Sequence, residues 1–110
     1  MAFTVLSLYH APDADRTKHR RRIDTGMYRL FTVVVRGQAE AVETCRQFLE
    51  DEGIDAVCLC PGFTHRDVAE IVDATRGQVG VFVARGDGPS AGVSRAAMER
   101  AGYPSAGEPD

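Results

Sequence analysis

The stretch IDAVCLCPGFTHRDVAEIVDATRG, residues 54–77, has the order of a strand, a turn and a helix. Residues 54–60 form a short apolar run, and apolar side chains then recur at helical spacing at Val68, Ile71 and Val72. The Pro-Gly pair between the two patterns is typical of a tight turn. This stretch therefore predicts one βα unit of an α/β fold.

Local structure explains several residues of this turn. Thr64 is a good N-cap, and Asp67, three residues later, completes a variant of the capping box. Phe63 and Val68 occupy the two positions of a hydrophobic staple, and Gly62 lets the backbone approach closely whatever lies above it. These residue types are thus accounted for without a ligand, and a functional role has to be argued from their surroundings.

A second βα unit precedes this one. Residues 28–35, YRLFTVVV, are the strongest strand signal, because their second half is continuously apolar, as in a strand covered on both faces. Helical spacing of apolar side chains over residues 37–53 predicts a helix. Gly37 suits its N-cap, and Gly53 lies where a C′ glycine belongs.

The remaining segments complete the expected sheet. Residues 3–9 and 78–84 are rich in β-forming residues and predict two more strands. Residues 10–26 lack clear periodicity and predict a long loop. Helices between consecutive strands form right-handed parallel crossovers. We therefore predict an α/β fold with a four-stranded, mostly parallel sheet (β-loop-β-α-β-α-β plus a short C-terminal helix), and the long loop leaves the direction of the first strand open.

The end of the chain has weaker signals. Residues 93–103 are expected to form the short C-terminal helix, with Val93 and Met98 facing inward. Residues 104–110 are expected to be a flexible tail. A chain of 110 residues corresponds to one domain, so residues 1–103 are predicted to form a single small domain.

Composition excludes several classes of protein. A net charge of −3 argues against nucleic acid as the main partner, and no apolar run approaches the ~20 residues that span a membrane. The N-terminus MAFTVLSLYH lacks a basic leader, and three cysteines are an odd number, so we expect reduced thiols in a cytoplasm. Because a small α/β chain buries a small core, a homo-oligomer is expected.

Ligands of open α/β sheets bind beyond the carboxyl ends of the strands, where helix N-termini also offer N–H groups to anions. The residues expected to bind a ligand at this edge are Arg36, Gly62, Phe63, Thr64 and Arg85. Two arginines beside a helix N-terminus indicate a carboxylate or a phosphate. The sequence therefore predicts a site for a small anionic metabolite.

Three side chains near this edge are candidates for catalysis. Cys60 follows a strand and precedes a helix N-terminus, where a lowered pKa would make it a nucleophile. His10 and His65 are candidates for acid–base chemistry. No nucleotide, flavin or metal motif is visible, so no cofactor is expected, and an enzyme of this kind would be an isomerase, a lyase or a cyclase.

The other cysteines are expected to be structural. Cys58 and Cys60 are two residues apart, which is not the usual spacing of a zinc knuckle, so no metal site is predicted. Cys58 and Cys45 are expected to be small buried apolar residues.

Two further functions stay open from the residues alone. In the first, the protein is a non-catalytic oligomeric interaction module that uses the same edge and the basic loop Arg16–Arg22, RTKHRRR. In the second, Cys60 serves a thiol-based redox function.

Three segments resemble those of DUF6506, a family of small bacterial proteins of unknown function. They are FTVLSLYHAPDAD near the start, IDTGMYRLFTVVVRG in the middle, and GIDAVCLCPGFTHRDVAEIVDA after it. The family motif tends to read Glu-Leu-Cys-Gly-Gly-Phe; here Leu59, Cys60, Gly62 and Phe63 match, while Cys58 and Pro61 replace the Glu and the first Gly. The resemblance implies a compact α/β fold and no established activity.

Overall fold

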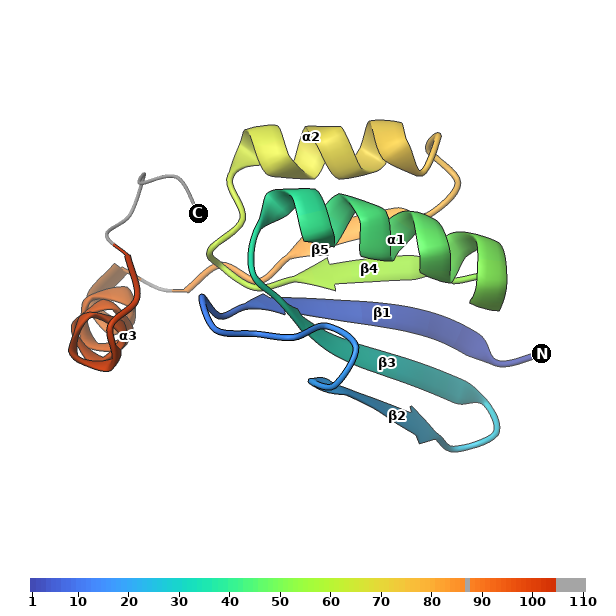
Figure 1. The fold of residues 1–110 in the computed structure, drawn as a ribbon. Helices are drawn as coiled ribbons and strands as arrows, with labels where there is room; N and C mark the ends of the chain where they lie inside the picture. Colours follow the sequence, from blue (N-terminus) through green and yellow to red (C-terminus); the bar gives the residue numbers. More distant parts are fainter. Residues whose placement is uncertain (87, 105–110) are drawn as a thin grey trace.

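The computed structural model describes residues 1–86 and 88–104. In this part of the chain one sheet has the strand order β2-β3-β1-β4-β5 (Figure 1). The elements are β1 (Phe3–His10), β2 (Arg20–Asp24), β3 (Tyr28–Val35), α1 (Gln38–Glu52), β4 (Ala56–Leu59), α2 (His65–Ala74), β5 (Gly80–Val83) and α3 (Gly88–Ala101). Apart from Pro104, the tail expected over residues 104–110 lies outside the described residues.

The predicted α/β class and the mostly parallel sheet are confirmed. β1 pairs in parallel with both β3 and β4, and β4 pairs in parallel with β5, which settles the direction of the first strand. The crossovers through α1 and α2 both run across the sheet in the direction from β3 toward β5. Because such crossovers are right-handed, the two helices must lie on the same face, as Figure 1 shows.

The expected count of four strands is wrong, because the sheet has a fifth strand inside the segment predicted as a loop. β2 (Arg20–Asp24) pairs antiparallel with β3 at one edge of the sheet. Its sequence RRRID lacks the alternation of apolar residues that signals a strand. Charged side chains are typical of edge strands, since they discourage pairing with other molecules. On the helix side, Arg20 and Arg22 lie over the rings of Phe48 and Phe31, at 5.3 and 6.0 Å from the ring centroids.

The hydrophobic core lies between the sheet and the pair α1 and α2. Its strand side chains are Leu6, Leu8, Phe31, Val33, Val35, Val57 and Leu59, and its helix side chains include Ala41, Cys45, Phe48 and Ile71. The predicted caps of α1 are confirmed, with Gly37 at the N-cap and Gly53 in the left-handed conformation at φ 66°. Cys45 is fully buried, as predicted, and burial raises the pKa of its thiol to about 12.

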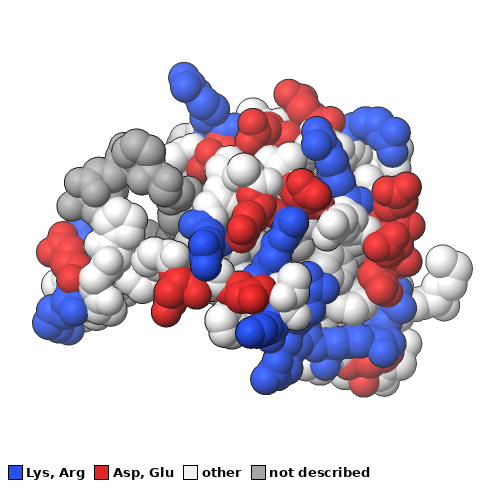
Figure 2. All heavy atoms as spheres, in the orientation of Figure 1, with Lys and Arg blue, Asp and Glu red and all other residues white. Residues whose placement is uncertain are grey.

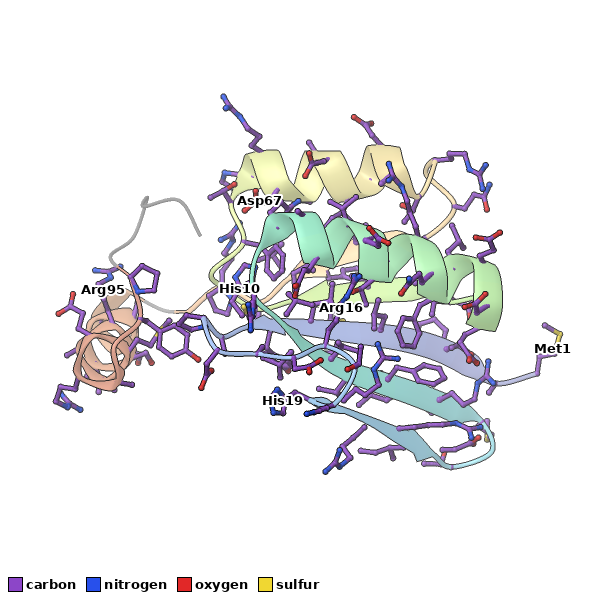
Figure 3. The ribbon with its side chains drawn as sticks, viewed as in Figure 1. Met1, His10, Arg16, His19, Asp67 and Arg95 are labelled. Atoms are coloured by element: carbon purple, nitrogen blue, oxygen red, sulfur yellow. The ribbon has the colours of Figure 1, made fainter. Side chains whose placement is uncertain are left out.

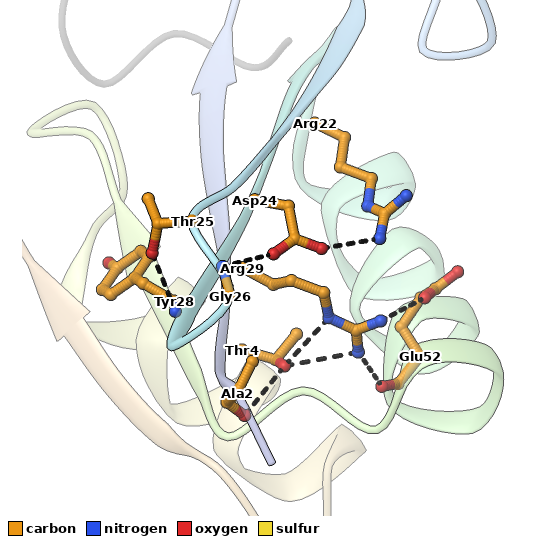
Figure 4. Close-up of polar contacts among 9 residues, drawn as sticks. All are labelled: Ala2, Thr4, Arg22, Asp24, Thr25, Gly26, Tyr28, Arg29 and Glu52. Carbon is orange, nitrogen blue, oxygen red and sulfur yellow. Dashed lines mark hydrogen bonds and ion pairs between the residues drawn. The ribbon is translucent and has the colours of Figure 1, made fainter.

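Arg29 ties the amino edge of the sheet to the end of α1 (Figure 4). Its guanidinium group donates hydrogen bonds to Thr4 Oγ1 at 3.3 Å and to the Glu52 carbonyl at 3.1 Å. It also forms an ion pair with the Glu52 carboxylate at 3.7 Å. A cation at the last turn of a helix compensates the free carbonyl groups there, so Arg29 fixes α1 against β1 and β3.

The opposite face of the sheet carries no helix in the part of the chain that the structure describes. Because side chains alternate along a strand, this open face presents the residues between the core positions. On β1, β3, β4 and β5 they are Phe3, Val5, Ser7, Tyr9, Tyr28, Leu30, Thr32, Val34, Ala56, Cys58, Gly80 and Phe82. Cys58 is exposed on this face, so the prediction that it is buried is wrong, because only one face of β4 is covered.

α3 differs from the expected C-terminal helix. It begins at Gly88, five residues earlier than predicted, because Pro89 is compatible with the first turn of a helix. The expectation that Val93 and Met98 face inward is wrong: 74% and 43% of their surfaces are exposed, and no residue of α3 is buried. Figure 1 shows α3 lying apart from the sheet, beyond the carboxyl ends of the strands. Within the described residues, no helix has the length and apolar character to cross a membrane.

Burial of Cys45 predicts a loss of stability in alkaline solution. The ordinary pKa of the thiol is 9.0 and burial raises it to about 12, so the folded state favours the protonated thiol more than the unfolded state does. The stability contributed by Cys45 is complete below pH 9.0 and decreases as the pH rises toward 12. One unit above the ordinary value, the loss in the free energy of unfolding should be about 1.4 kcal/mol.

Urea unfolding of the wild type and of Cys45→Ala over this pH range measures the effect. The variant is expected to be less stable at neutral pH and to lose less stability with rising pH, since it has no buried thiol that must ionise. Parallel pH dependences for the two proteins would contradict this account of Cys45.

Candidate thiol site at the carboxyl edge of the sheet

The segments that follow four strands emerge at one edge of the sheet. The sheet hydrogen bonds continue past the strand ends, from Ala11 N to the Val35 carbonyl at 2.9 Å, from Cys60 N to the Leu8 carbonyl at 3.1 Å, and from Ala84 N to the Leu59 carbonyl at 2.9 Å. These bonds bring the residues after β1, β3, β4 and β5 side by side. In Figure 3 His10, at the end of β1, and Asp67, in the first turn of α2, both lie toward this end of the sheet.

His10 packs against the turn that follows β4. It is the last residue of β1, and its imidazole stacks on the ring of Phe63, with 4.0 Å between centroids and 27° between planes. Phe63 is completely buried and belongs to the hydrophobic core. The core therefore supports the position of His10 through this stacking.

The turn itself brings Gly62 against His10 and Cys60. Phe63 N donates a hydrogen bond to the Cys60 carbonyl at 3.2 Å, which closes a turn with Pro61 and Gly62 at its centre. Gly62 does not have a positive φ, so backbone conformation does not require a glycine here. The space is tight, however: a Cβ atom at this position would lie 3.2 Å from His10 Nδ1, closer than Cβ atoms usually pack, and 3.7 Å from Cys60 Sγ, which is an ordinary contact. The predicted close approach at Gly62 is confirmed, and its neighbours are these two side chains.

The surroundings of Cys60 favour its thiolate. Burial raises the pKa of the Cys60 thiol, but hydrogen bonds to the sulfur from the His10 side chain and from the backbone N–H groups of Gly62 and His10 outweigh it. The net effect is a pKa below the ordinary thiol value of 9.0. A half-buried thiol with hydrogen-bond donors around it is typical of reactive cysteines.

The predicted start of α2 is confirmed. Thr64 Oγ1 accepts a hydrogen bond from Asp67 N at 3.1 Å, and the Asp67 carboxylate accepts one from Thr64 N at 2.9 Å. Both partners of the capping box are thus present. His65 is the first residue of α2 and is exposed, and the hydrogen bonds to Cys60 come from His10 and Gly62 instead. The structure therefore brings His10 and Cys60 together and leaves His65 outside this pair.

The two predicted arginines lie at the same edge and hold its loops. Arg36 Nε donates a hydrogen bond to the Ala14 carbonyl at 2.8 Å. Arg85 Nη1 donates to the Phe63 carbonyl at 3.1 Å and to the Pro61 carbonyl at 3.4 Å, so it connects the end of β5 to the turn. Both arginines are otherwise exposed.

Gln38 is a residue of this edge that sequence reasoning missed. Its Nε2 donates a hydrogen bond to the Asp67 carbonyl at 3.2 Å and another to Glu70 Oε1 at 2.8 Å. It therefore joins the first turn of α1 to the first turns of α2. The only signal in the sequence is its place at a predicted helix start, which does not reveal a partner about thirty positions away.

The basic run Arg16–Arg22 is structured rather than a free loop. Arg16 Nη1 donates hydrogen bonds to the Glu40 carbonyl and to Thr44 Oγ1, both at 3.3 Å, and the last three arginines belong to β2. A groove of about 400 Å³ lies between β2 and α1, and Figure 2 shows Lys and Arg gathered over β2. Its lining is Arg20, Arg21, Arg22, Phe31, Val33, Gln47, Phe48, Asp51 and Glu52. Among the described residues, no group of three or more His, Cys, Asp and Glu side chains is placed to bind a metal ion.

The hydrogen bond from His10 predicts that this side chain controls the reactivity of Cys60. In a Cys58→Ser background, the rate of alkylation by iodoacetamide should rise with pH around a midpoint below 9.0, because the thiolate is the nucleophile. His10→Ala should raise this midpoint, since it removes a donor to the sulfur. His65→Ala is the matched control and should leave it unchanged. Equal midpoints for His10→Ala and the parent protein would disprove the pairing.

Comparison with known proteins identifies the family of this chain. The family model DUF6506, described as a family of unknown function, matches residues 2–98, which include every strand and most of α3. No curated protein and no solved structure matches the chain. The match covers most of the chain, and the protein therefore belongs to the DUF6506 family.

Proposed function

We propose that the carboxyl edge of the sheet binds a small anionic metabolite, a carboxylate or a phosphate, and that Cys60 and His10 are the reactive groups beside it. The observation that carries the proposal is the approach of His10 and Cys60 to the backbone of Gly62, where a Cβ atom would lie only 3.2 Å from His10 Nδ1. The proposal places the protein in a reducing cytoplasm, where Cys60 stays a free thiol.

Positive charge at this edge supports an anionic ligand. A guanidinium group has five N–H donors. In the part of the chain that the structure describes, the side chain of Arg36 donates through Nε and that of Arg85 through Nη1. Both groups are exposed, so donors remain for a carboxylate or a phosphate, which arginine binds in a bidentate manner. The capped start of α2 and residues Gly62, Phe63 and Thr64 lie beside Arg85.

The pair Cys60 and His10 is suited to proton transfer within such a ligand. The lowered pKa of Cys60 makes its thiolate easier to form than that of an ordinary cysteine, and a thiolate can accept a proton; an imidazole is the side chain that most often donates or accepts one in enzymes. Isomerases, lyases and cyclases that work without a cofactor need this combination of acid and base in a protected site. His65, at the exposed start of α2, is a further acid–base candidate for a ligand that extends toward solvent.

A thermal-shift screen tests ligand binding. Inorganic phosphate, acetate and pyruvate are compared with uncharged alcohols and amides of similar size. A ligand at a hundredfold excess over its Kd stabilises the folded state by about 2.7 kcal/mol, which raises Tm by roughly 10 °C for a domain of this size. Arg36→Ala and Arg85→Ala should lose most of this response, each measured against its own Tm without ligand. Arg46→Ala, on the exposed side of α1, is the matched control and should keep the full response.

Two results would overturn the anion site. The first is the absence of any rise in the Tm of the wild type with the three anions. The second is a full response in both Arg36→Ala and Arg85→Ala.

A second candidate, an interaction module that uses the basic segment, is supported by the groove between β2 and α1. Arg21 and Arg22 are exposed at this groove, and the aromatic rings of Phe31 and Phe48 form part of its wall. The acidic side chains of Asp51 and Glu52 on the same wall reduce its net charge. A complex held by these arginines would weaken as the ionic strength rises, because salt screens exposed charges.

A further inference from the structure

The open face of the sheet is an apolar surface that no helix covers in the described part of the chain. At its positions on β1, β3, β4 and β5 no side chain is charged. Several large apolar side chains are exposed there: Phe3 at 50%, Tyr9 at 46%, Tyr28 at 40% and Phe82 at 59%. Parallel sheets are normally covered on both faces, and uncharged aromatic patches are typical of interfaces. This face therefore fits a protein layer rather than water.

α3 is a helix with an uncovered apolar side of its own. Val93, Ala97 and Ala101 follow one another at intervals of four residues and form one stripe along the helix. Arg95 and Glu99 lie on the opposite side of the helix. Among the described residues, α3 shares no extensive packing with the sheet or the other helices. A helix of this length is marginal in water without tertiary contacts, so its stability calls for a partner surface.

The direction of the chain after β5 carries α3 away from its own sheet. Ala84 continues the pairing with β4, and Arg85 is held by the Pro61 and Phe63 carbonyls at the carboxyl edge. α3 begins at Gly88 and lies beyond this edge, outside the sheet from which it comes (Figure 1). The open face of a second copy is then the surface available to it.

We propose that two copies of this chain form a symmetric dimer in which α3 of each copy covers the open sheet face of the other. The dimensions agree, since a helix of 14 residues is about 21 Å long and an eight-residue strand such as β1 is about 26 Å long. Reciprocal exchange of one element closes the assembly with twofold symmetry. It covers both open faces at once and completes a layered helix, sheet, helix arrangement. The inference is independent of the ligand proposed above.

Sedimentation equilibrium at micromolar concentration tests the dimer. The wild type should have the mass of two chains at both low and high salt, because apolar contacts are not screened. Phe82→Glu on the sheet and Val93→Glu on α3 should each raise the dissociation constant about a hundredfold or more, since each buries a charge at the interface. Both residues are exposed in the single chain, at 59% and 74%, so circular dichroism should show an intact fold.

Val72→Glu is the matched control, because Val72 is 37% exposed on α2, on the helix side of the sheet, and this variant should remain a dimer. A wild type with the mass of one chain would overturn the proposal. A dimer that separates in high salt would also overturn it and would point to the basic groove instead.

A disulfide trap identifies α3 as the exchanged element. Cys58 is exposed on the open face, and Cys45 is buried. In a Cys60→Ser background, Ala97→Cys should form a disulfide with Cys58 under mild oxidation and give a covalent species of two chains, with the linked peptides identified by mass spectrometry. Glu99→Cys, on the polar side of α3, should cross-link at least tenfold more slowly. A disulfide between residues 58 and 97 within one chain, or no such disulfide, would show that α3 is not exchanged.

Discussion

The handedness of the two crossovers is the constraint on which the rest of this structure depends. Both connections run in the same direction across the sheet, so a right-handed path places α1 and α2 on one face. The connection from β1 to β3 contains the edge strand β2 instead of a helix, and it adds nothing to the second face. One rule of chain geometry thus determines where the core lies and which surface stays open.

The same topology assembles the candidate site. Because β1, β3, β4 and β5 are parallel, the residues after them reach one edge, and the starts of α1 and α2 lie there as well. At this edge two effects compete at Cys60: burial disfavours the thiolate, while donors from His10 and Gly62 favour it. The donors prevail, so the pKa is lowered. At Cys45, where no such donors act, burial raises the pKa to about 12. Two thiols of one small domain are therefore chemically different because of their surroundings.

The arginines of this edge both hold the loops in place and expose positive charge. Arg85 donates a hydrogen bond to the Phe63 carbonyl in the turn after β4, and Arg36 donates one to the Ala14 carbonyl in the loop after β1. Both arginines therefore stabilise the edge in the absence of any ligand. Their charge remains exposed in the same place. For the proposed anionic ligand these groups would be preorganised, because hydrogen bonds to the scaffold already position them.

The sequence by itself determined the βα units, because their signals are local. The apolar spacing of α1 and α2, the capping box of Thr64 and Asp67, and Gly53 at the end of α1 all act within a few residues of one another. The strand β2 was missed because an edge strand of arginines has no apolar alternation, and the start of α3 was misplaced because Pro89 is tolerated in a first helical turn.

Only the tertiary structure decided which residues meet. His10 pairs with Cys60, and Gln38 contacts Asp67 and Glu70, so residues far apart in the chain meet. The exposure of Cys58 depends on which face of the sheet is covered. From the sequence alone His10, Cys60 and His65 were all candidates for catalysis, and packing separated them. The physical reason is that secondary structure follows from neighbouring residues, whereas a site follows from strand order and from the handedness of the connections.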